Sequence, residues 1–412
     1  MLDLPELIVT RPEELPDCCD HIAAAAEVGF DTEFVGEDSY IPHLCLLQIA
    51  TDSRIYLIDP LTVGPLDRFW QVLTDPARLV VVHAGREEVR LCKHFTSRDP
   101  NAFDLQIAAG LVGLTYPISY GNLLADLVHV RLEKRETLTE WRKRPLTPEQ
   151  IHYAFDDVRY LLAAWRTLKA RLDERGRGDW AKEEFARLAA SLGPVEGESE
   201  KWRKLPGLGQ LDRKRLAVVR ELFFWREELA ARMNRPPRVL VRDDLLVEIA
   251  RRNPTKETDL HVVRGLAHRF AGGILQAVER GKGLPVDQHP RMPRREVDPL
   301  QLGLIANLLT AVVGDFAARH HIAPNLVATS NELKLLVRCR WRGVPLPQES
   351  LLGQGWRAEH VLPELRALLE GRKWLRVDDV HRDSPFSYRE EARSHKPEAP
   401  PTSADPPSRQ ST

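Results

Sequence analysis

The chain has 412 residues, too many for one ordinary domain, so its length predicts two or three. Its apolar and charged fractions, 43% and 29%, are those of a globular protein that can build a core without disulfide or metal staples. The formal net charge of −1 conceals an asymmetry, because the first hundred residues carry about ten more acidic than basic side chains and residues 201–300 carry about nine more basic than acidic ones. This asymmetry favours one region that holds cations and another that holds polyanions.

The cysteines and the N-terminus favour a cytoplasmic protein. The five cysteines form no C-x-x-C pair, which argues against disulfides and zinc and indicates buried thiols in a reducing compartment; they are Cys18, Cys19, Cys45, Cys92 and Cys339. MLDLPELIVT has no basic start and no long apolar core. We find no apolar run near the roughly 20 residues of a membrane helix, so we expect a cytoplasmic protein without membrane contact.

The first 165 residues alternate strands and helices. A strand is expected at LIVT, a helix over residues 12–28 that ends at Gly29, and then three strands at GFDTEFV, HLCLLQIAT and RIYLID. The helix LDRFWQVL, the buried strand RLVVVHA and the helix REEVRLCKHF follow. This order predicts an α/β domain with a mixed sheet.

A long helix is expected over residues 147–172, where Thr147 is the N-cap, Pro148 occupies the first turn and Gln150 the capping-box position. We place the first domain at residues 1–172, followed by a helix and linker at 173–206.

From residue 207 the pattern is all helical. The face of one helix carries apolar residues at spacings of three, four and seven, namely Leu216, Val219, Leu222, Phe223 and Leu229. A second helix, RDDLLVEIARR, has Asp243 as its expected cap. We predict helical domains at 207–288 and 298–380, which could be weakly related, and a disordered tail rich in Pro and Ser at 381–412.

Two carboxylates stand side by side on an expected central strand. Asp31 and Glu33 are two residues apart and therefore share one face. If that face is buried, the pair repels unless a cation neutralises it. Because Phe30 and Phe34 occupy the other face, the alternation fits a solvent-exposed acidic face equally well.

Two further segments supply polar groups. Tyr153 and Asp157 are one helical turn apart in YAFDDVRYL, with Asp156 as a competing carboxylate. In VVVHAGREEV, a tight turn leads from a strand into a helix that begins with Glu87 and Glu88. Acids in a first helical turn also suit the helix dipole. Taken together, four carboxylates and a tyrosine are typical of two-metal hydrolysis of a phosphodiester.

These segments resemble the three exonuclease motifs of the DEDD superfamily, in its tyrosine subclass: DTEFVGEDSY with LCLLQIA, then HAGREEV, then YAFDDVRYL. TEWRKRPLTPEQIHYAFDDVRYLL in particular resembles the ribonuclease D family, and the similarity covers about residues 5–170. The resemblance implies a ribonuclease-H-like fold. It also implies that Asp31, Glu33 and Asp157 hold two Mg²⁺ or Mn²⁺ ions and that Tyr153 positions the attacking water.

The second motif departs from the family pattern. The family has an aspartate at the position of Glu88, so the resemblance implies that Glu88 is the fourth metal ligand. Its side chain is one methylene longer than that of aspartate. The neighbouring Glu87 could substitute for it. Because a displacement of about 1 Å in an active site can cost roughly a hundredfold, the extra methylene bears directly on catalysis.

The basic middle of the chain resembles an HRDC domain over KLPGLGQLDRKRLAVVRELFFWREELAARMNRPPRVLVRDDLLVEIARRNPT, and residues 298–380 resemble a second, more divergent one. In the first of these two segments, the residues expected to contact phosphates are Arg213, Lys214, Arg215, Arg220, Arg235 and Arg238.

We therefore expect a monomeric 3′→5′ exoribonuclease that releases nucleoside 5′-monophosphates, with transfer RNA precursors as the substrate that the resemblance implies. A DNA exonuclease with the same site, and a catalytically weak RNA-binding protein, remain open.

Overall fold

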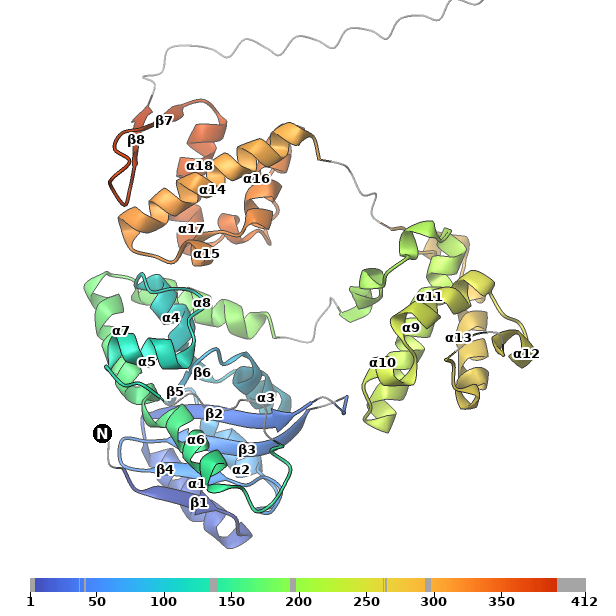
Figure 1. Ribbon diagram of the computed structural model, residues 1–412, viewed down its shortest axis with the longest axis horizontal. Coiled ribbons are helices and arrows are strands. Elements are labelled where there is room, and N and C mark those ends of the chain that lie inside the picture. Colours follow the sequence, from blue (N-terminus) through green and yellow to red (C-terminus); the bar gives the residue numbers. More distant parts are fainter. Residues whose placement is uncertain are drawn as a thin grey trace, which may run out of the picture. The chain divides into compact units, whose positions relative to one another are not determined.

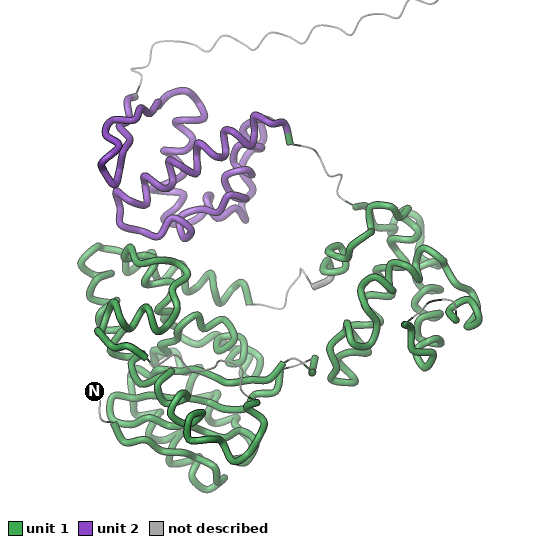
Figure 2. Tube along the Cα trace, viewed as in Figure 1, with its two compact units in different colours: residues 1–298 green, residues 299–412 purple. Residues whose placement is uncertain are grey.

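The computed structural model describes residues 4–36, 38–40, 42–132, 140–192, 198–261, 263, 265–292 and 298–390. The chain divides into two compact units, residues 1–298 and 299–412 (Figure 2). The first unit contains an α/β part and a helical part, and the second is mainly helical (Figure 1).

A six-stranded mixed sheet organises the α/β part, in the order β1-β4-β3-β2-β5-β6. Its strands are β1 (Glu6–Val9), β2 (Glu27–Val35), β3 (His43–Ala50), β4 (Ile55–Ile58), β5 (Leu79–Val82) and β6 (Asn101–Asp104). The consecutive strands β2, β3 and β4 are antiparallel, whereas β1 with β4, β2 with β5 and β5 with β6 are parallel. The predicted fold class, an α/β domain with a mixed sheet followed by helical domains, is confirmed.

Helices cover both faces of the sheet. They are α1 (Leu15–Ala24), α2 (Asp67–Leu73), α3 (Arg86–Thr96), α4 (Leu105–Leu111), α5 (Tyr120–Leu127), α6 (Pro148–Arg159), α7 (Leu161–Glu174) and α8 (Gly178–Ala190). Side chains of α1, α2 and α3 pack with Phe30 in one core. The other face is covered by α6, which packs on β2, β3 and β4, and by α7, which packs on β2 and β5 (Figure 1).

Two helix boundaries differ from the prediction. The helix expected up to residue 28 ends at Ala24, and Gly29 lies inside β2. A Cβ on Gly29 would lie 3.0 Å from the Leu161 Cβ, so this glycine serves the close approach of α7 and not a helix end. The helix expected over 147–172 is two helices, α6 and α7, that meet at Tyr160.

The helical part of the first unit is built around α9 (Arg213–Met233). It adds α10 (Pro237–Leu240), α11 (Asp243–Arg252), α12 (Glu257–Leu260) and α13 (Ala271–Gly283). The predicted apolar face of α9 is buried at Leu216, Val219 and Leu222. The expected cap was wrong: Arg242 is the N-cap of α11, and Asp243 is its first residue and pairs with Arg226 at 2.8 Å.

The second unit repeats this series of elements. Its helices are α14 (Leu300–His320), α15 (Pro324–Val327), α16 (Ser330–Arg342), α17 (Gly355–His360) and α18 (Leu362–Leu369). Both α9 and α14 have 21 residues and end at a left-handed residue, Asn234 or His321, and each is followed by a four-residue helix that starts with proline. This correspondence favours the interpretation that the two helical blocks are related.

The prediction that residues 381–412 form a disordered tail was wrong for the first residues of this range. β8 (Phe386–Glu390) pairs antiparallel with β7 (Lys373–Val377). The buried Asp315 carboxylate explains why this hairpin forms, because it accepts hydrogen bonds from Ser384 Oγ at 2.6 Å and Tyr388 Oη at 2.7 Å. Residues 391–412 of the expected tail lie outside the described residues.

The expectation that no segment is long and apolar enough for a membrane helix also needs correction. By length and composition alone α14 meets that test, with a mean hydropathy of 1.6. Its Asp315 is buried and hydrogen-bonded, and the helix packs on α15 and α16. The helix is thus partly buried, with 44% of its apolar window inside the fold and Leu300, Leu304 and Leu308 exposed.

The five cysteines are all free and buried, as predicted.

Candidate active site

The first two acids lie on β2. Asp31 and Glu33 alternate with Phe30, which is buried in the core on the face of the sheet that α1 and α2 cover. Burial raises the pKa of Asp31 well above its usual range, and the nearby Glu88 and Asp157 carboxylates raise it further. Burial and Glu88 raise the pKa of Glu33 to about 7. This acidic face is therefore not the solvent-exposed alternative.

Helix α6 supplies Tyr153 and Asp157. Its start is set by the predicted capping box, in which Thr147 Oγ1 accepts from the Gln150 N–H at 3.2 Å and Gln150 Oε1 accepts from the Thr147 N–H at 2.9 Å. Burial and Glu33 raise the pKa of Asp157 to about 8, although a hydrogen bond from Tyr153 lowers it. Tyr153 and Asp157 are thus hydrogen-bonded neighbours on one helix face.

The segment before α6 is fixed to the sheet by Arg144. Its guanidinium donates to Asp59 Oδ1 at 2.8 Å, to the Cys45 carbonyl at 2.7 Å and to the Trp141 carbonyl at 2.7 Å. The Trp141 ring lies 6.2 Å from the Tyr153 ring. The RKRP segment, residues 142–145, therefore fixes the position of α6 on the sheet.

A tight turn positions Glu88. Ala84 has a φ of 53°, and Asp104 accepts hydrogen bonds from the Ala84 N–H at 3.3 Å and the Gly85 N–H at 3.0 Å. A Cβ on Gly85 would lie 2.2 Å from Val82 Cγ2, so only glycine fits there. The turn directs the first turn of α3, with the buried Glu88, towards β2.

The Glu88 carboxylate accepts a hydrogen bond from Thr32 Oγ1 at 2.6 Å. Burial raises the pKa of Glu88 to about 7, against the lowering effect of this hydrogen bond. The alternatives are engaged elsewhere: Glu87 pairs with Arg90 at 2.9 Å, and Asp156 pairs with Arg159 at 3.1 Å. The structure thus places Glu88 and Asp157, not their neighbours, beside the β2 acids.

The four carboxylates form one electrostatic cluster, defined as Asp31, Glu33, Glu88 and Asp157. In the described ranges none of them forms an ion pair with Lys, Arg or His, and no three His, Cys, Asp or Glu groups are already close enough to hold one ion. Carboxylates that crowd together without a cationic partner, one of them buried and three half-buried, suit a divalent metal ion, whose preferred ligands are oxygens. The donor set fits metal ions by its chemistry.

Sequence reasoning missed the residues that support this cluster. Besides Thr32 and Asp104, Tyr120 at the start of α5 has a buried hydroxyl without a hydrogen-bond partner among the described residues. Burial and the charges of Asp157 and Asp31 raise its pKa well above the usual range. Because Tyr120 lies in PISYGNLL, far in sequence from the acids, no local pattern identifies it.

The six basic residues expected to contact phosphates differ in their availability. The Arg213 guanidinium donates to the His289 carbonyl at 2.9 Å and the Val286 carbonyl at 3.3 Å, so it holds the chain after α13. Arg220 is half-buried beside Glu221. The exposed members are Lys214, Arg215, Arg235 and Arg238, of which Arg215 pairs with Asp212 and Arg238 with Asp243.

Comparisons with known proteins agree with this arrangement. A family model described as 3′-5′ exonuclease matches residues 7–173, and one described as HRDC domain matches residues 215–277. Ribonuclease D of Gluconacetobacter diazotrophicus is 32% identical over 379 residues, which cover 90% of this chain and 95% of that protein. Ribonuclease D of Desulfotalea psychrophila is 33% identical over 86% of this chain and 96% of that protein.

The crystal structure of Escherichia coli RNase D, an exoribonuclease involved in structured RNA processing, covers 88% of this chain and 98% of its own with a TM-score of 0.77 and 26% identity. The identity of the relatives extends through the exonuclease and helical parts alike. With its mixed sheet, its acidic cluster and its HRDC domain, the chain belongs to the ribonuclease D family of 3′-5′ exonucleases.

Proposed function

We propose that this protein is a 3′→5′ exoribonuclease that hydrolyses the terminal phosphodiester of RNA with two divalent ions, Mg²⁺ or Mn²⁺, and releases nucleoside 5′-monophosphates. The observation that carries the proposal is the cluster of four carboxylates, the buried Glu88 with the half-buried Asp31, Glu33 and Asp157, which forms no ion pair in the described ranges and in which Asp157 has Tyr153 as a hydrogen-bonded neighbour. Membership of the ribonuclease D family supports RNA as the substrate.

Each residue has a role that follows from its position. Asp31, Glu33, Glu88 and Asp157 would hold the ions, which when bound activate water and stabilise the leaving 3′ oxygen. Tyr153, hydrogen-bonded to Asp157, is placed to orient the attacking water. Because the Tyr153 pKa is raised by burial and by Asp157, the phenol stays protonated at neutral pH and acts as a hydrogen-bond donor, not as a base.

The helical domains would hold the RNA backbone. The candidates for phosphate contacts are the exposed Lys214, Arg215, Arg235 and Arg238. The contribution of such electrostatic contacts to RNA affinity decreases as the salt concentration rises. The relative from E. coli acts in structured RNA processing, which supports structured RNA and transfer RNA precursors as substrates here. We further propose that the enzyme is monomeric and works in the cytoplasm without membrane contact.

The proposal is tested with a 5′-labelled single-stranded RNA, a DNA of the same sequence, and either Mg²⁺, Mn²⁺ or a chelator. We expect a ladder that shortens from the RNA 3′ end with metal and an intact strand with chelator. Equal or faster shortening of DNA would favour the DNA exonuclease. If wild type binds RNA but does not shorten it with either metal, the result would favour the RNA-binding protein. If Glu88→Asp then shortens the RNA, the inactivity of wild type would be due to the extra methylene of Glu88.

Thr32→Val should lower the rate at neutral pH by about 10- to 100-fold, the usual cost of losing a group that orients a metal ligand. Valine keeps the shape but removes the hydroxyl that donates to Glu88 at 2.6 Å and lowers its pKa. The pKa of Glu88 therefore rises, and the loss should shrink as the pH is raised. The measurement is a pH–rate profile for Thr32→Val and for Thr32→Ser, which keeps the hydroxyl. Equal profiles for both variants and wild type would contradict the role.

A further inference from the structure

Gln48 on β3 is a polar residue in an otherwise apolar part of the sheet. It belongs to the LCLLQIA segment, in which the neighbouring Leu46, Leu47 and Ile49 are, like Gln48 itself, fully buried. Neither Nε2 nor Oε1 of its side chain has a hydrogen-bond partner among the residues that the structure describes. Because an amide that is buried without a hydrogen bond destabilises the fold, nearly all such groups have a partner, and this one requires an explanation.

The register of the sheet places Gln48 beside Asp31. The two residues are Cα partners in the antiparallel pairing of β2 with β3. Directly opposite residues of such a pair share one face of the sheet, with Cβ atoms about 4.5–5.5 Å apart. The adjacent Leu47 and Ile49 pack with Phe30 in the core on the side of α1 and α2. Gln48 therefore points, with Asp31, to the face that α6 covers.

Asp31 is the nearest side-chain acceptor to this amide in the sheet. Of the two residues that flank Gln48 in register, Leu57 on β4 has an apolar side chain and Asp31 has a carboxylate. Glu33, the diagonal neighbour on β2, lies farther away. Between described residues Asp31 makes one hydrogen bond, in which Oδ1 accepts from the Thr32 N–H at 2.8 Å. The second oxygen, Oδ2, can therefore accept another.

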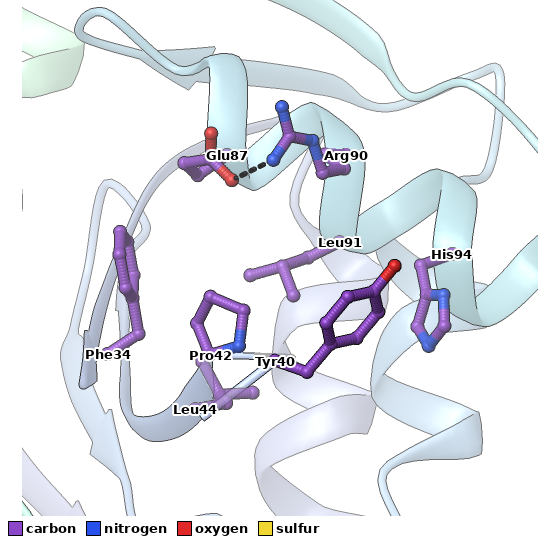
Figure 3. Close-up of a pocket in the computed structure, with 8 residues that line it drawn as sticks. All are labelled: Phe34, Tyr40, Pro42, Leu44, Glu87, Arg90, Leu91 and His94. Carbon is purple, nitrogen blue, oxygen red and sulfur yellow. Dashed lines mark hydrogen bonds and ion pairs between the residues drawn. The ribbon is translucent and has the colours of Figure 1, made fainter. Parts of the chain in front are cut away.

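The acids that neighbour the cluster in sequence already have cationic partners. Glu87 lies on the wall of an apolar pocket, where its carboxylate pairs with Arg90 at 2.9 Å (Figure 3). Asp156 pairs with Arg159 at 3.1 Å. The unpaired amide thus adjoins a carboxylate of the cluster and not one of these ion pairs.

We infer that Gln48 is a positioning residue for the metal-binding carboxylates: with ions at the cluster, its amide donates a hydrogen bond to the Asp31 carboxylate and holds it in the orientation in which it binds. The inference rests on the proposed function and adds a residue to it. The last torsion of an aspartate side chain is broad, so Asp31 can turn towards the amide. A charged carboxylate is the stronger acceptor, and carboxylates that bind metal ions are themselves usually hydrogen-bonded.

The test measures metal binding apart from catalysis, with Gln48→Met, which nearly keeps the shape of the side chain and removes both polar atoms. We expect the Kd for Mn²⁺, measured without RNA from the electron paramagnetic resonance of the free ion, to rise about 10- to 100-fold. The rate of RNA shortening should fall at low Mn²⁺ and return towards that of wild type near saturation, with an unchanged KM for RNA. The melting temperature in chelator should not fall, because no hydrogen bond between described residues is lost.

Leu57→Met is the matched control, because Leu57 is fully buried and flanks Gln48 from the other side, separated from Asp31 by β3. It introduces the same side chain and should leave the Kd for Mn²⁺ unchanged. Gln48→Leu is the second variant if Gln48→Met does not fold. An unchanged Kd in the Gln48 variant, or an equal rise in the control, would assign Gln48 to packing and overturn this inference alone. A wild type that binds no Mn²⁺ and leaves RNA intact would overturn the inference and the proposed function together.

Discussion

Asp31→Asn should abolish RNA hydrolysis, by at least about 10²–10³-fold, and should make the metal-free protein no less stable than wild type. The loss is expected because the variant removes a carboxylate from the cluster that would hold the ions, and one preorganised electrostatic contact is commonly worth this much. The gain in stability is expected because burial and the nearby Glu88 and Asp157 already disfavour the charge of Asp31.

Rates from the 5′-labelled RNA assay and melting temperatures in chelator measure the two effects. Asp156→Asn is the matched control, because Asp156 lies beside the cluster but pairs with Arg159 and His152. It should retain most of the activity and gain no stability. A destabilised Asp31→Asn would show that the fold needs the Asp31 carboxylate itself, which accepts a hydrogen bond from the Thr32 N–H at 2.8 Å. Activity near that of wild type would refute its role as a ligand.

Local spacing predicted the candidate site because each pair of residues lies on one element. Asp31 and Glu33 follow the two-residue period of a strand, and Tyr153 and Asp157 the four-residue period of a helix. The cap at Thr147 is likewise local and is confirmed. The choice between Glu87 and Glu88 needed the structure, since the direction of α3 depends on the turn that Asp104 holds from another strand.

The errors of prediction have the same origin. Gly29 reads as a helix end in the sequence, but the nearby Leu161 comes from α7, more than a hundred residues away. β8 was missed because its hydrogen bonds to Asp315 join segments about seventy residues apart. Thr32 and Tyr120 carry no motif of their own, and their relevance follows only from the tertiary contacts of Glu88 and Asp157.

Glu88 departs from the family pattern by one methylene, and the structure provides a partner that the longer side chain reaches. Its carboxylate accepts a hydrogen bond from Thr32 Oγ1, on the residue that separates the two acids of β2 in sequence. We therefore expect the longer side chain and Thr32 to act as a pair, so that Glu88→Asp loses the hydrogen bond unless the backbone of α3 shifts.

The metal-free protein should lose stability as the pH rises, and divalent ions should restore it. The pKa values of Glu33 and Glu88 are raised to about 7 and that of Asp157 to about 8. A carboxyl whose pKa is higher in the folded protein than in the unfolded chain stabilises the fold below its unfolded pKa. That contribution is lost as the pH rises through the folded value. For Glu33, Glu88 and Asp157 the decline therefore falls between about pH 4.5 and 8, as their charged forms come to repel one another.

For Glu88, whose pKa rises from 4.5 to about 7, the contribution is on the order of 3 kcal/mol, or roughly 5–10 °C in melting temperature. Melting curves of wild type and Glu88→Gln in chelator should coincide near pH 4.5 and diverge towards pH 8, where the variant melts higher. Excess Mn²⁺ should then raise the melting temperature of wild type strongly at pH 8, weakly near pH 5, and less in Glu88→Gln, because ions bind the charged carboxylates. Parallel curves at all pH values would mean that Glu88 titrates as in the unfolded chain, and its burial beside the other carboxylates would then not disfavour its charged form.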